Sequence, residues 1–437
     1  MRTILIGLLT FIALLGLGQP ARADLDRYFS KPEPVYKWEK TGEKKLDGGT
    51  MTDLHLVSQT WQGNVWQHRL MIFRPDKPVR TDFCTLFNTG GGGSEGEMTL
   101  GMTAAQITGM PFAILYGIPN QPLYDGKTED ALVAYTWQKF METGDESWPL
   151  HFPMAKAVLK AMDAIQAYTK EAGQPAINGF VIAGASKRGW TTWLAGASKD
   201  KRIKGIVPMV IDTLNVAAQI PHQLAAYGKP SEQVQDYTST GMLEKLMTPQ
   251  GKRLLALEDP YSYRDRLTMP KLIVLGTNDR YWSQDSLNLY WDDLKGPKWV
   301  LYNSNAGHSL EGLDTQFRVL NAVGAFARAV AGGDSLPKPT WKYSFRDNFS
   351  SLAVRSDLPI KSAKLWSAHA STQDFRDAKW SFEPMHPLDT ADPAHGVFGS
   401  KGVPTAGYTA MYGELIYTQN GKPFSLTTQL QILTPQK

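Results

Sequence analysis

The stretch Gly179 to Trp190, GFVIAGASKRGW, decides the fold class of this 437-residue chain. An apolar, strand-like run breaks at Gly184 and places Ser186 on a turn before a helix. A nucleophilic serine needs such a sharp strand-to-helix turn, and its neighbours must be small enough for close approach. Gly184 and Ala185 meet that demand. The pattern departs from G-x-S-x-G, because Arg188 takes the place of the second glycine and Gly189 follows it.

Strand-like and helical segments alternate around this turn. Short apolar runs bounded by glycine or proline predict buried strands, and apolar residues at helical spacing predict helices. An antiparallel hairpin turning near Gly63 comes first, followed by strands at 83–88, 112–117, 180–183, 206–210, 272–276 and 299–302 and helices at 131–141, 154–168 and 313–331. Strands separated by helices pair in parallel. We therefore expect an α/β-hydrolase fold over residues 24–336.

Two segments depart from this alternation. Residues 212–266 are polar and helix-prone, which predicts either a helical cap inserted over the sheet or a long crossover with two or three helices. From residue 341 to 437 the pattern changes to short alternating strands, and Asn420-Gly421 is a strong hairpin signal between two of them. These strands predict a β-sandwich-like C-terminal domain.

The first 23 residues have the pattern of a secretory signal peptide, with a basic Arg2, an apolar stretch and small residues at Ala21 and Ala23. We expect cleavage near Ala23 and export to the periplasm or the medium, without stable membrane insertion. The formal net charge of +4 does not indicate a nucleic-acid partner. Cys84, the single cysteine, is expected to be a buried thiol. The oligomeric state is not readable from the sequence.

A serine nucleophile needs a histidine to accept its proton and an acid to orient that histidine. In this fold class the chain order is serine, acid, histidine. Asp279 follows the predicted strand LIVLG, and His308 follows the next predicted strand, WVLY. Asp285 lies six residues after Asp279 and is the rival candidate for the acid. The spacing thus predicts Ser186, Asp279 and His308 as catalytic residues.

An oxyanion hole requires main-chain N–H groups beside the nucleophile. The amide of Lys187 is one candidate. A loop after an early strand supplies the second donor in this fold class, and the glycine-rich run 89–93 follows FCTLF in that place. Gly90 and Gly91 are the predicted donors. A phosphate-binding loop is disfavoured, because the run lacks the Lys-Ser/Thr ending of the Walker pattern.

Charged and aromatic residues near these motifs have two interpretations each. Glu95 and Glu97, with Glu129 and Asp130 further on, either hold a substrate amine or form solvated surfaces. The side chains of Lys187 and Arg188 either favour an anionic substrate or, as we expect, point outward from the start of a helix. Trp190 and Trp282 are the tryptophans expected to border a pocket, with Glu95 as a further candidate. No metal or other cofactor is implied, since no Cys/His or Asp-rich metal spacing is present.

The segments GASKRGWTTWL around Ser186, ALVAYTWQKFMETGDESWPLHFPMAKA before it, and GTNDRYW and NAGH after it resemble the PhoPQ-activated pathogenicity-related protein family. The resemblance implies an exported α/β-hydrolase-like protein linked to virulence or secreted signalling. It places the family's serine, acid and histidine on Ser186, Asp279 and His308. The leading hypothesis is an exported serine hydrolase that forms an acyl-enzyme, with peptides slightly favoured over small-molecule esters as substrates, because a cap, an added β-domain and nearby acids suit peptidases. The alternative is a secreted binding or signalling protein on the same scaffold, because fold does not fix function.

Overall fold

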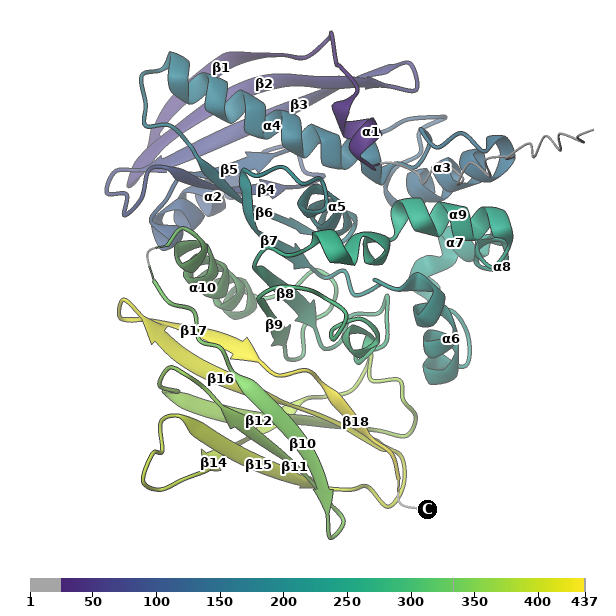
Figure 1. The fold of residues 1–437 in the computed structure, drawn as a ribbon, viewed down its shortest axis with the longest axis vertical. Helices are drawn as coiled ribbons and strands as arrows, with labels where there is room; N and C mark the ends of the chain where they lie inside the picture. Colours follow the sequence, from purple (N-terminus) through teal and green to yellow (C-terminus); the bar gives the residue numbers. More distant parts are fainter. Residues whose placement is uncertain (1–24, 333, 436–437) are drawn as a thin grey trace, which may run out of the picture.

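A computed structural model describes residues 25–332 and 334–435. The predicted signal peptide therefore lies outside the described residues. Helices flank a large central sheet. The C-terminal strands lie together at one end of the molecule, where a second, four-stranded sheet packs on the first (Figure 1). Within the described ranges no helix is both long and apolar enough to cross a membrane.

The central sheet runs β1-β2-β3-β5-β4-β6-β7-β8-β9. The first three strands are antiparallel, β5 pairs antiparallel with β3, and the pairs from β5 through β9 are parallel. The strand bounds are Lys37–Leu46 (β1), Gly49–Trp61 (β2), Asn64–Pro75 (β3), Phe83–Asn88 (β4), Phe112–Leu115 (β5), Gly179–Ala185 (β6), Ile203–Met209 (β7), Lys271–Gly276 (β8) and Lys298–Asn303 (β9). The predicted hairpin and the six predicted strands are all present.

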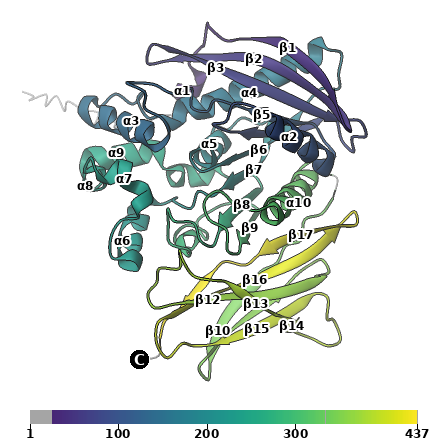
Figure 2. The same ribbon diagram turned by 180° about the vertical axis from the view of Figure 1, so that it is seen from behind.

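Helices cover both faces of this sheet. Helices α4 and α5 pack on one face, whereas α2 and α10 pack together on the other, as the opposite view shows (Figure 2). The helix bounds are Leu25–Ser30 (α1), Glu95–Thr108 (α2), Glu129–Thr143 (α3), His151–Glu171 (α4), Lys187–Gly196 (α5), Val216–Tyr227 (α6), Gln235–Thr238 (α7), Met242–Leu246 (α8), Pro249–Glu258 (α9) and Leu313–Val330 (α10), with short 3-10 turns at Glu232–Val234, Pro260–Arg266 and Ser286–Leu289.

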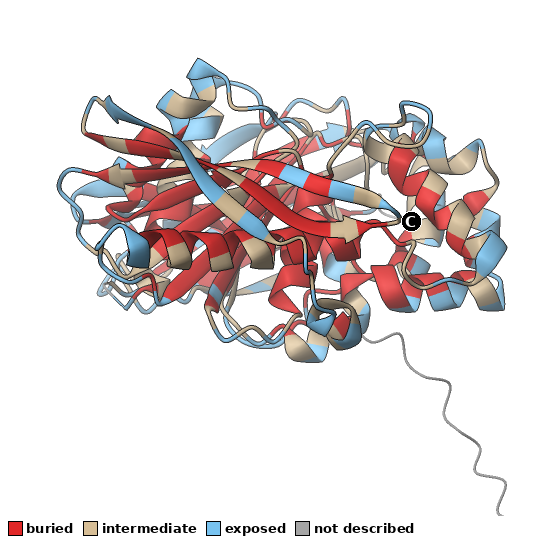
Figure 3. Ribbon diagram, turned by 90° about the horizontal axis from the view of Figure 1, so that it is seen from above, coloured by how far each residue is buried: buried red, intermediate tan, exposed pale blue. Residues whose placement is uncertain are grey.

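Strand β6 shows why the parallel strands form the core. Its side chains alternate between faces, as a pleated strand requires. Phe180 and Ile182 pack into the cluster that contains α4 and α5, whereas Val181 and Ala183 pack into the cluster that contains α10. Because both faces are covered, the strand is apolar along its whole length. Figure 3 shows the resulting buried layer through the middle of the molecule. Cys84 is buried in this layer, and burial raises the pKa of its thiol to about 12.

Between β7 and β8 the chain forms only helices and turns, from α6 to the 3-10 turn Pro260–Arg266. Helices α7 and α9 contact α3, and the 3-10 turn contacts α5. This segment covers the edge of the sheet at which the parallel strands β6, β7 and β8 end (Figure 1). Polar contacts of α6 with the loop after β8 hold it in place.

The last strands form two packed antiparallel layers. One layer, β17-β16-β12-β13 with β18 beside β16, continues the central sheet, because Thr427 of β17 pairs with Val300 of β9. The other layer is β10-β11-β15-β14. The predicted Asn420-Gly421 turn joins β16 to β17, and both turn residues have positive φ. Strand bounds are Thr340–Arg346 (β10), Phe349–Arg355 (β11), Ser362–Ala370 (β12), Ser381–Pro384 (β13), His386–Pro387 (β14), Gly396–Gly402 (β15), Tyr408–Gln419 (β16), Lys422–Thr427 (β17) and Gln431–Leu433 (β18).

Candidate active site

Ser186 lies between the end of β6 and the start of α5 with φ 57° and ψ −129°. A non-glycine residue rarely adopts this conformation, and such backbone strain concentrates at functional sites. Its N–H donates to the carbonyl oxygen of Met209 at 2.9 Å, which ties the turn to the end of β7. The conformation turns the chain from strand to helix within one residue. The predicted elbow is therefore present in the structure.

Two glycines allow this turn to pack closely. A Cβ at Gly184 would lie 2.4 Å from Asn88 Nδ2 and 2.5 Å from the carbonyl oxygen of Arg188. A Cβ at Gly189 would lie 2.7 Å from Ile211 Cγ2 and 2.8 Å from the Met209 oxygen. Atoms cannot approach that closely without displacing backbone. The second glycine is thus needed at the third residue after Ser186, where the first turn of α5 meets the chain after β7.

Ser186, His308 and Asp279 form a hydrogen-bonded line. Asp279 lies in the loop after β8, and His308 lies in the loop after β9. With the proton of His308 on Nδ1, this nitrogen donates to Asp279 Oδ2 at 2.8 Å, and the Ser186 hydroxyl donates to His308 Nε2 at 2.8 Å. The other oxygen of Asp279 accepts from the Tyr281 N–H at 3.0 Å. This geometry lets the histidine accept a proton from the serine while the carboxylate orients it.

Asp285, the rival acid, lies elsewhere. Its Oδ1 pairs with His222 Nε2 at 2.7 Å, on the side of α6. This pair raises the pKa of His222, because the hydrogen bond to Asp285 favours the protonated ring. The structure therefore brings Asp279, and not Asp285, to His308.

The two loops that carry Asp279 and His308 are bonded to each other and to the C-terminal strands. The Asn278 N–H donates to the Ala306 oxygen at 3.0 Å, and the Asn305 N–H donates to Thr277 Oγ1 at 2.9 Å. The Asn305 side chain exchanges hydrogen bonds with the main chain of Trp380 at 3.0 and 2.8 Å. The segment before β13 thus holds the histidine loop in place.

The amides of the three predicted oxyanion donors differ in whether they already have a hydrogen-bond partner. Lys187 begins α5, so its N–H has no intrahelical partner. Gly90 donates no hydrogen bond within the described residues, and a Cβ there would collide with the Arg188 guanidinium at 2.1 Å. The Gly91 N–H donates to Thr89 Oγ1 at 3.3 Å. Lys187 and Gly90 are the amides left available.

The side chains of Lys187 and Arg188 do not point outward, which corrects the prediction. Both are buried and pair with Glu129 at the start of α3. The Arg188 guanidinium binds both oxygens of Glu129, at 2.7 and 2.6 Å, and Lys187 Nζ lies 2.7 Å from Oε2. Burial opposes the charge on Glu129, but the hydrogen bonds and charges of Arg188 and Lys187 outweigh it and hold the pKa of this carboxyl far below its usual range. Glu129 is thus paired with two cations and still partly solvated, with 42% of its side chain exposed.

Asp130 is likewise engaged within the protein. Its Oδ1 accepts from the Tyr237 hydroxyl at 3.2 Å, and its Oδ2 accepts from the Tyr281 hydroxyl at 3.0 Å. Burial, and secondarily the charge of Asp130, raises the pKa of both tyrosines, so they remain protonated donors. The Tyr281 ring lies 4.2 Å from the His308 ring. Asp130 thus links the helix α3 to the ring that packs on the histidine.

A pocket of about 120 Å³ opens beside Ser186. Trp190 and Trp282 line it, in agreement with the prediction, and Trp137, His151 and Tyr281 line it although the sequence did not single them out. Glu95 is not among the lining residues, which corrects the prediction. It is exposed in the first turn of α2, whose N-terminus is capped by Ser94 and Glu97.

His151 had no sequence signal, because a lone histidine in an apolar helix has the pattern of a core residue. The His151 ring stacks on Trp190 at 4.6 Å, and its Nδ1 pairs with the buried Glu258 at 2.5 Å. Trp137 also donates to Glu258, at 3.1 Å. The wall of the pocket is therefore fixed by a buried polar pair behind it.

Comparison with known sequences places the chain in a family. Residues 25–376 match the sequence profile of the PhoPQ-activated pathogenicity-related protein family. The chain is also similar to autocrine proliferation repressor protein A of Dictyostelium discoideum, with 34% identity over 432 residues, which covers 91% of this chain and 86% of that protein.

Among solved structures, the fold is similar to acetyl xylan esterase 1 from Thermoanaerobacterium sp. JW/SL YS485. The TM-score is 0.50 with 12% identity, and the match covers 70% of this chain and 93% of that one. At this identity the likeness shows the fold alone. Together with the strand order and the covering helices, it confirms the α/β-hydrolase fold with a C-terminal antiparallel part.

Proposed function

This chain belongs to the PhoPQ-activated pathogenicity-related protein family, and on that premise we propose that it is a serine hydrolase that forms an acyl-enzyme. One observation carries the proposal. Ser186 is held in the strained elbow conformation, and its hydroxyl lies 2.8 Å from the imidazole that Asp279 orients. Such an arrangement activates a hydroxyl that is otherwise a weak nucleophile.

In the proposed reaction, Ser186 Oγ attacks the carbonyl carbon of the substrate while His308 Nε2 accepts the hydroxyl proton. Asp279 stabilises the imidazolium that forms. The amides of Lys187 and Gly90 are the proposed donors to the oxyanion. His308 then donates its proton to the leaving group, and the acyl group stays on Ser186. Water, deprotonated by His308, releases the acid and regenerates the serine.

An ester is the favoured substrate. Of the nearby acids that would hold the amine of a peptide, Glu129 is paired with Arg188 and Lys187, and Asp130 accepts from two tyrosines. These two carboxylates are thus engaged within the protein, and Glu95 lies outside the pocket. A named esterase also shares the fold, although that likeness does not identify a substrate.

A fluorophosphonate probe tests the proposal, because it reacts with activated serines. We expect stoichiometric labelling of the wild-type protein at Ser186 and none in Ser186→Ala. Ser262→Ala is a matched control, since this serine lies in the turn Pro260–Arg266 and its hydroxyl donates to the Leu255 oxygen. An unlabelled wild-type protein, or labelling that persists in Ser186→Ala, would refute the proposal.

A second candidate function is a secreted signal, which the similarity to a protein named as an autocrine proliferation repressor favours. The Ser186→Ala variant separates the two candidates. The purified protein is added to cells of the organism that makes it, and their growth is measured. If Ser186→Ala slows growth as strongly as the wild type, signalling does not need the serine. If Ser186→Ala loses both the labelling and the effect on growth, hydrolysis and signalling use the same site.

The proposed site of action lies outside the cytoplasm, since the first 23 residues have the composition of a signal peptide. N-terminal sequencing of the protein recovered from the periplasm or the medium tests this. A mature chain starting at Asp24 is expected, and an intact chain retained in the cytoplasm would contradict it.

A further inference from the structure

We infer that the pocket beside Ser186 binds one uncharged apolar group of the ester, about the size of benzene, which an apolar cavity of about 150 Å³ holds. The inference rests on the proposed hydrolase function and adds the substrate class to it. The pocket has about 120 Å³ and contains Ser186, so a group bound there is attached to the bond that the serine attacks. An acetyl group alone would leave most of this space empty.

The lining is apolar on the side of the helical segment between β7 and β8. Helix α6 presents Val216, Ile220 and Leu224 to the pocket, at the four-residue spacing that places side chains on one helical face. Leu243 and Leu246 of α8 line it as well. These side chains cover part of the space, and Leu224 remains exposed. An apolar group entering here would leave water for a hydrocarbon surface.

The polar side chains of the lining are largely occupied by the protein itself. Gln219 Nε2 donates to the oxygens of Leu214 and Ser286, and Gln223 Nε2 donates to the Tyr281 oxygen at 2.7 Å. Asp130 accepts from Tyr237 and Tyr281, and Lys187 is paired with Glu129. No lining charge is therefore free to pair with a charged substrate group, whose burial without a partner is strongly unfavourable.

Two lining nitrogens, His151 Nε2 and Trp282 Nε1, have no hydrogen-bond partner within the described residues. Both are buried atoms of aromatic rings. As N–H donors they could bind an oxygen of the substrate, and neither residue is a carboxylate or an ammonium group.

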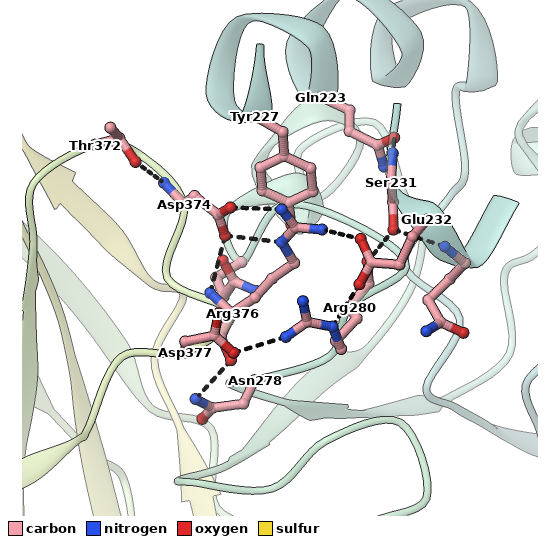
Figure 4. A network of polar contacts seen from close by, with 12 residues as sticks. Gln223, Tyr227, Ser231, Glu232, Asn278, Arg280, Thr372, Asp374, Arg376 and Asp377 are labelled. Atoms are coloured by element: carbon pink, nitrogen blue, oxygen red, sulfur yellow. Dashed lines mark hydrogen bonds and ion pairs between the residues drawn. The ribbon is translucent and has the colours of Figure 1, made fainter. Parts of the chain in front are cut away.

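A polar network joins the end of α6, which lines part of the pocket, to the neighbouring loops (Figure 4). The Tyr227 hydroxyl donates to the Trp282 oxygen at 2.6 Å, and the Arg376 guanidinium stacks 4.0 Å over the Tyr227 ring. Arg376 and Arg280 both pair with Glu232, at 2.7 and 2.5 Å. The end of α6 is thus fixed to the loop after β8 and to the segment before β13.

Two ester series test the inference and determine which side of the ester occupies the pocket. One series holds the alcohol constant, as methyl esters from acetate to decanoate and methyl benzoate, and the other holds the acid constant, as alkyl acetates from methyl to decyl. Because burial of each methylene favours binding by about fourfold, one series should rise in kcat/KM by on the order of a hundredfold up to about six carbons. It should then level off or fall.

Monomethyl adipate supplies the test of charge. It matches methyl hexanoate in the number of acyl carbons but ends in a carboxylate. If the pocket takes the acyl group, monomethyl adipate should have a kcat/KM at least about a hundredfold below that of methyl hexanoate, since its carboxylate has no partner in the lining. If the alkyl acetates are the series that rises, the acetate of 6-hydroxyhexanoic acid takes the place of adipate. A charged ester hydrolysed as well as its apolar match would overturn the inference.

Variants at Ile220 connect the profile to this pocket. Ile220→Trp should lower the ratio of kcat/KM for the six-carbon ester to that for methyl acetate by at least about tenfold, because it fills the space. Ile220→Ala should move the optimum to longer chains. Ala225→Trp is the matched control on the exposed side of α6, and it should leave the ratio unchanged.

The outcomes distinguish this inference from the function on which it rests. A flat profile in both series, or a ratio unchanged in both Ile220 variants, overturns the inference while fluorophosphonate labelling of Ser186 still supports the hydrolase. A wild-type protein that is neither labelled nor active on any ester overturns both.

Discussion

Replacing each of the two acid candidates, Asp279 and Asp285, with asparagine tests which one orients His308. Asp279→Asn should lower kcat on the order of 10,000-fold, because an amide no longer fixes the tautomer and orientation of His308. Asp285→Asn should retain activity within a few-fold, since Asp285 pairs with His222 and not with His308. Steady-state kinetics on one ester measure both. An inactive Asp285→Asn protein beside an active Asp279→Asn protein would reverse the assignment.

Glu129 acts on the same turn through its partners. It holds Lys187 and Arg188, and the Arg188 Nε donates to the Ile118 oxygen at 2.5 Å beside the loop of Gly90. Glu129→Gln should lower kcat by up to about a hundredfold, because small displacements of reacting groups are that costly.

A positioning role for Glu129 should leave KM nearly unchanged, and Glu129→Asp should restore part of kcat. Glu95→Gln is the control, because Glu95 is exposed on α2 and outside the pocket. Equal losses in the Glu95 and Glu129 variants would show that the pairing has no specific role.

Helix α5 packs so closely on the chain after β7 that Gly189, in its first turn, has no room for a side chain. Gly189→Ala should destabilise the protein by about 1–3 kcal/mol and lower activity, since its Cβ would press on Ile211 and the Met209 oxygen. Gly92→Ala should be tolerated, because a Cβ there meets nothing within 4 Å. Urea unfolding monitored by fluorescence measures both, and equal stability of the two variants would contradict the packing argument.

The elements that the sequence predicted are those whose signal is local. The apolar run before Ser186 and the loops of Asp279 and His308 could be located because strand, turn and chain order are all visible in consecutive residues. The orientation of Lys187 and Arg188 could not, since their partner Glu129 lies on another helix and is brought near only by the tertiary fold. Helical spacing alone made an outward direction the expected one.

The pocket was hidden in the sequence for a related reason. Val216, Ile220 and Leu224 have the spacing of any core-facing helix, so no local signal separates a residue that lines a cavity from one that fills a core. Trp190 and Trp282 were identified only because they neighbour Ser186 and Asp279 in the chain. The structure adds what the sequence lacks, namely the packing of the segment between β7 and β8 on the strand ends.

At the scale of the whole molecule, the C-terminal strands are continuous with the hydrolase sheet and share a hydrophobic cluster with it. Strand β17 pairs with β9, and one hydrophobic cluster contains Phe326 of α10 together with Leu415 and Leu426 of the C-terminal strands. Asn305, three residues before His308, is bonded to the main chain of Trp380. The histidine loop is therefore hydrogen-bonded to a C-terminal segment that contributes no reacting group.

Calorimetry should accordingly record one cooperative unfolding transition for the full chain. Removal of residues 340–437 should abolish folding, because it exposes the β9 edge and the face of α10 that packs on β17. Two separate transitions, or a soluble and active truncated protein, would show instead that the C-terminal strands form an independent domain.

The account depends most on whether Ser186 is acylated. Rapid mixing of the enzyme with a 4-nitrophenyl ester measures this directly, with mass spectrometry of the quenched protein to locate the acyl group. We predict a burst of 4-nitrophenol close to one equivalent per chain and an acyl adduct on the peptide that contains Ser186, both absent in Ser186→Ala. Turnover without any adduct on Ser186, or an adduct on another residue that persists in Ser186→Ala, would contradict the account.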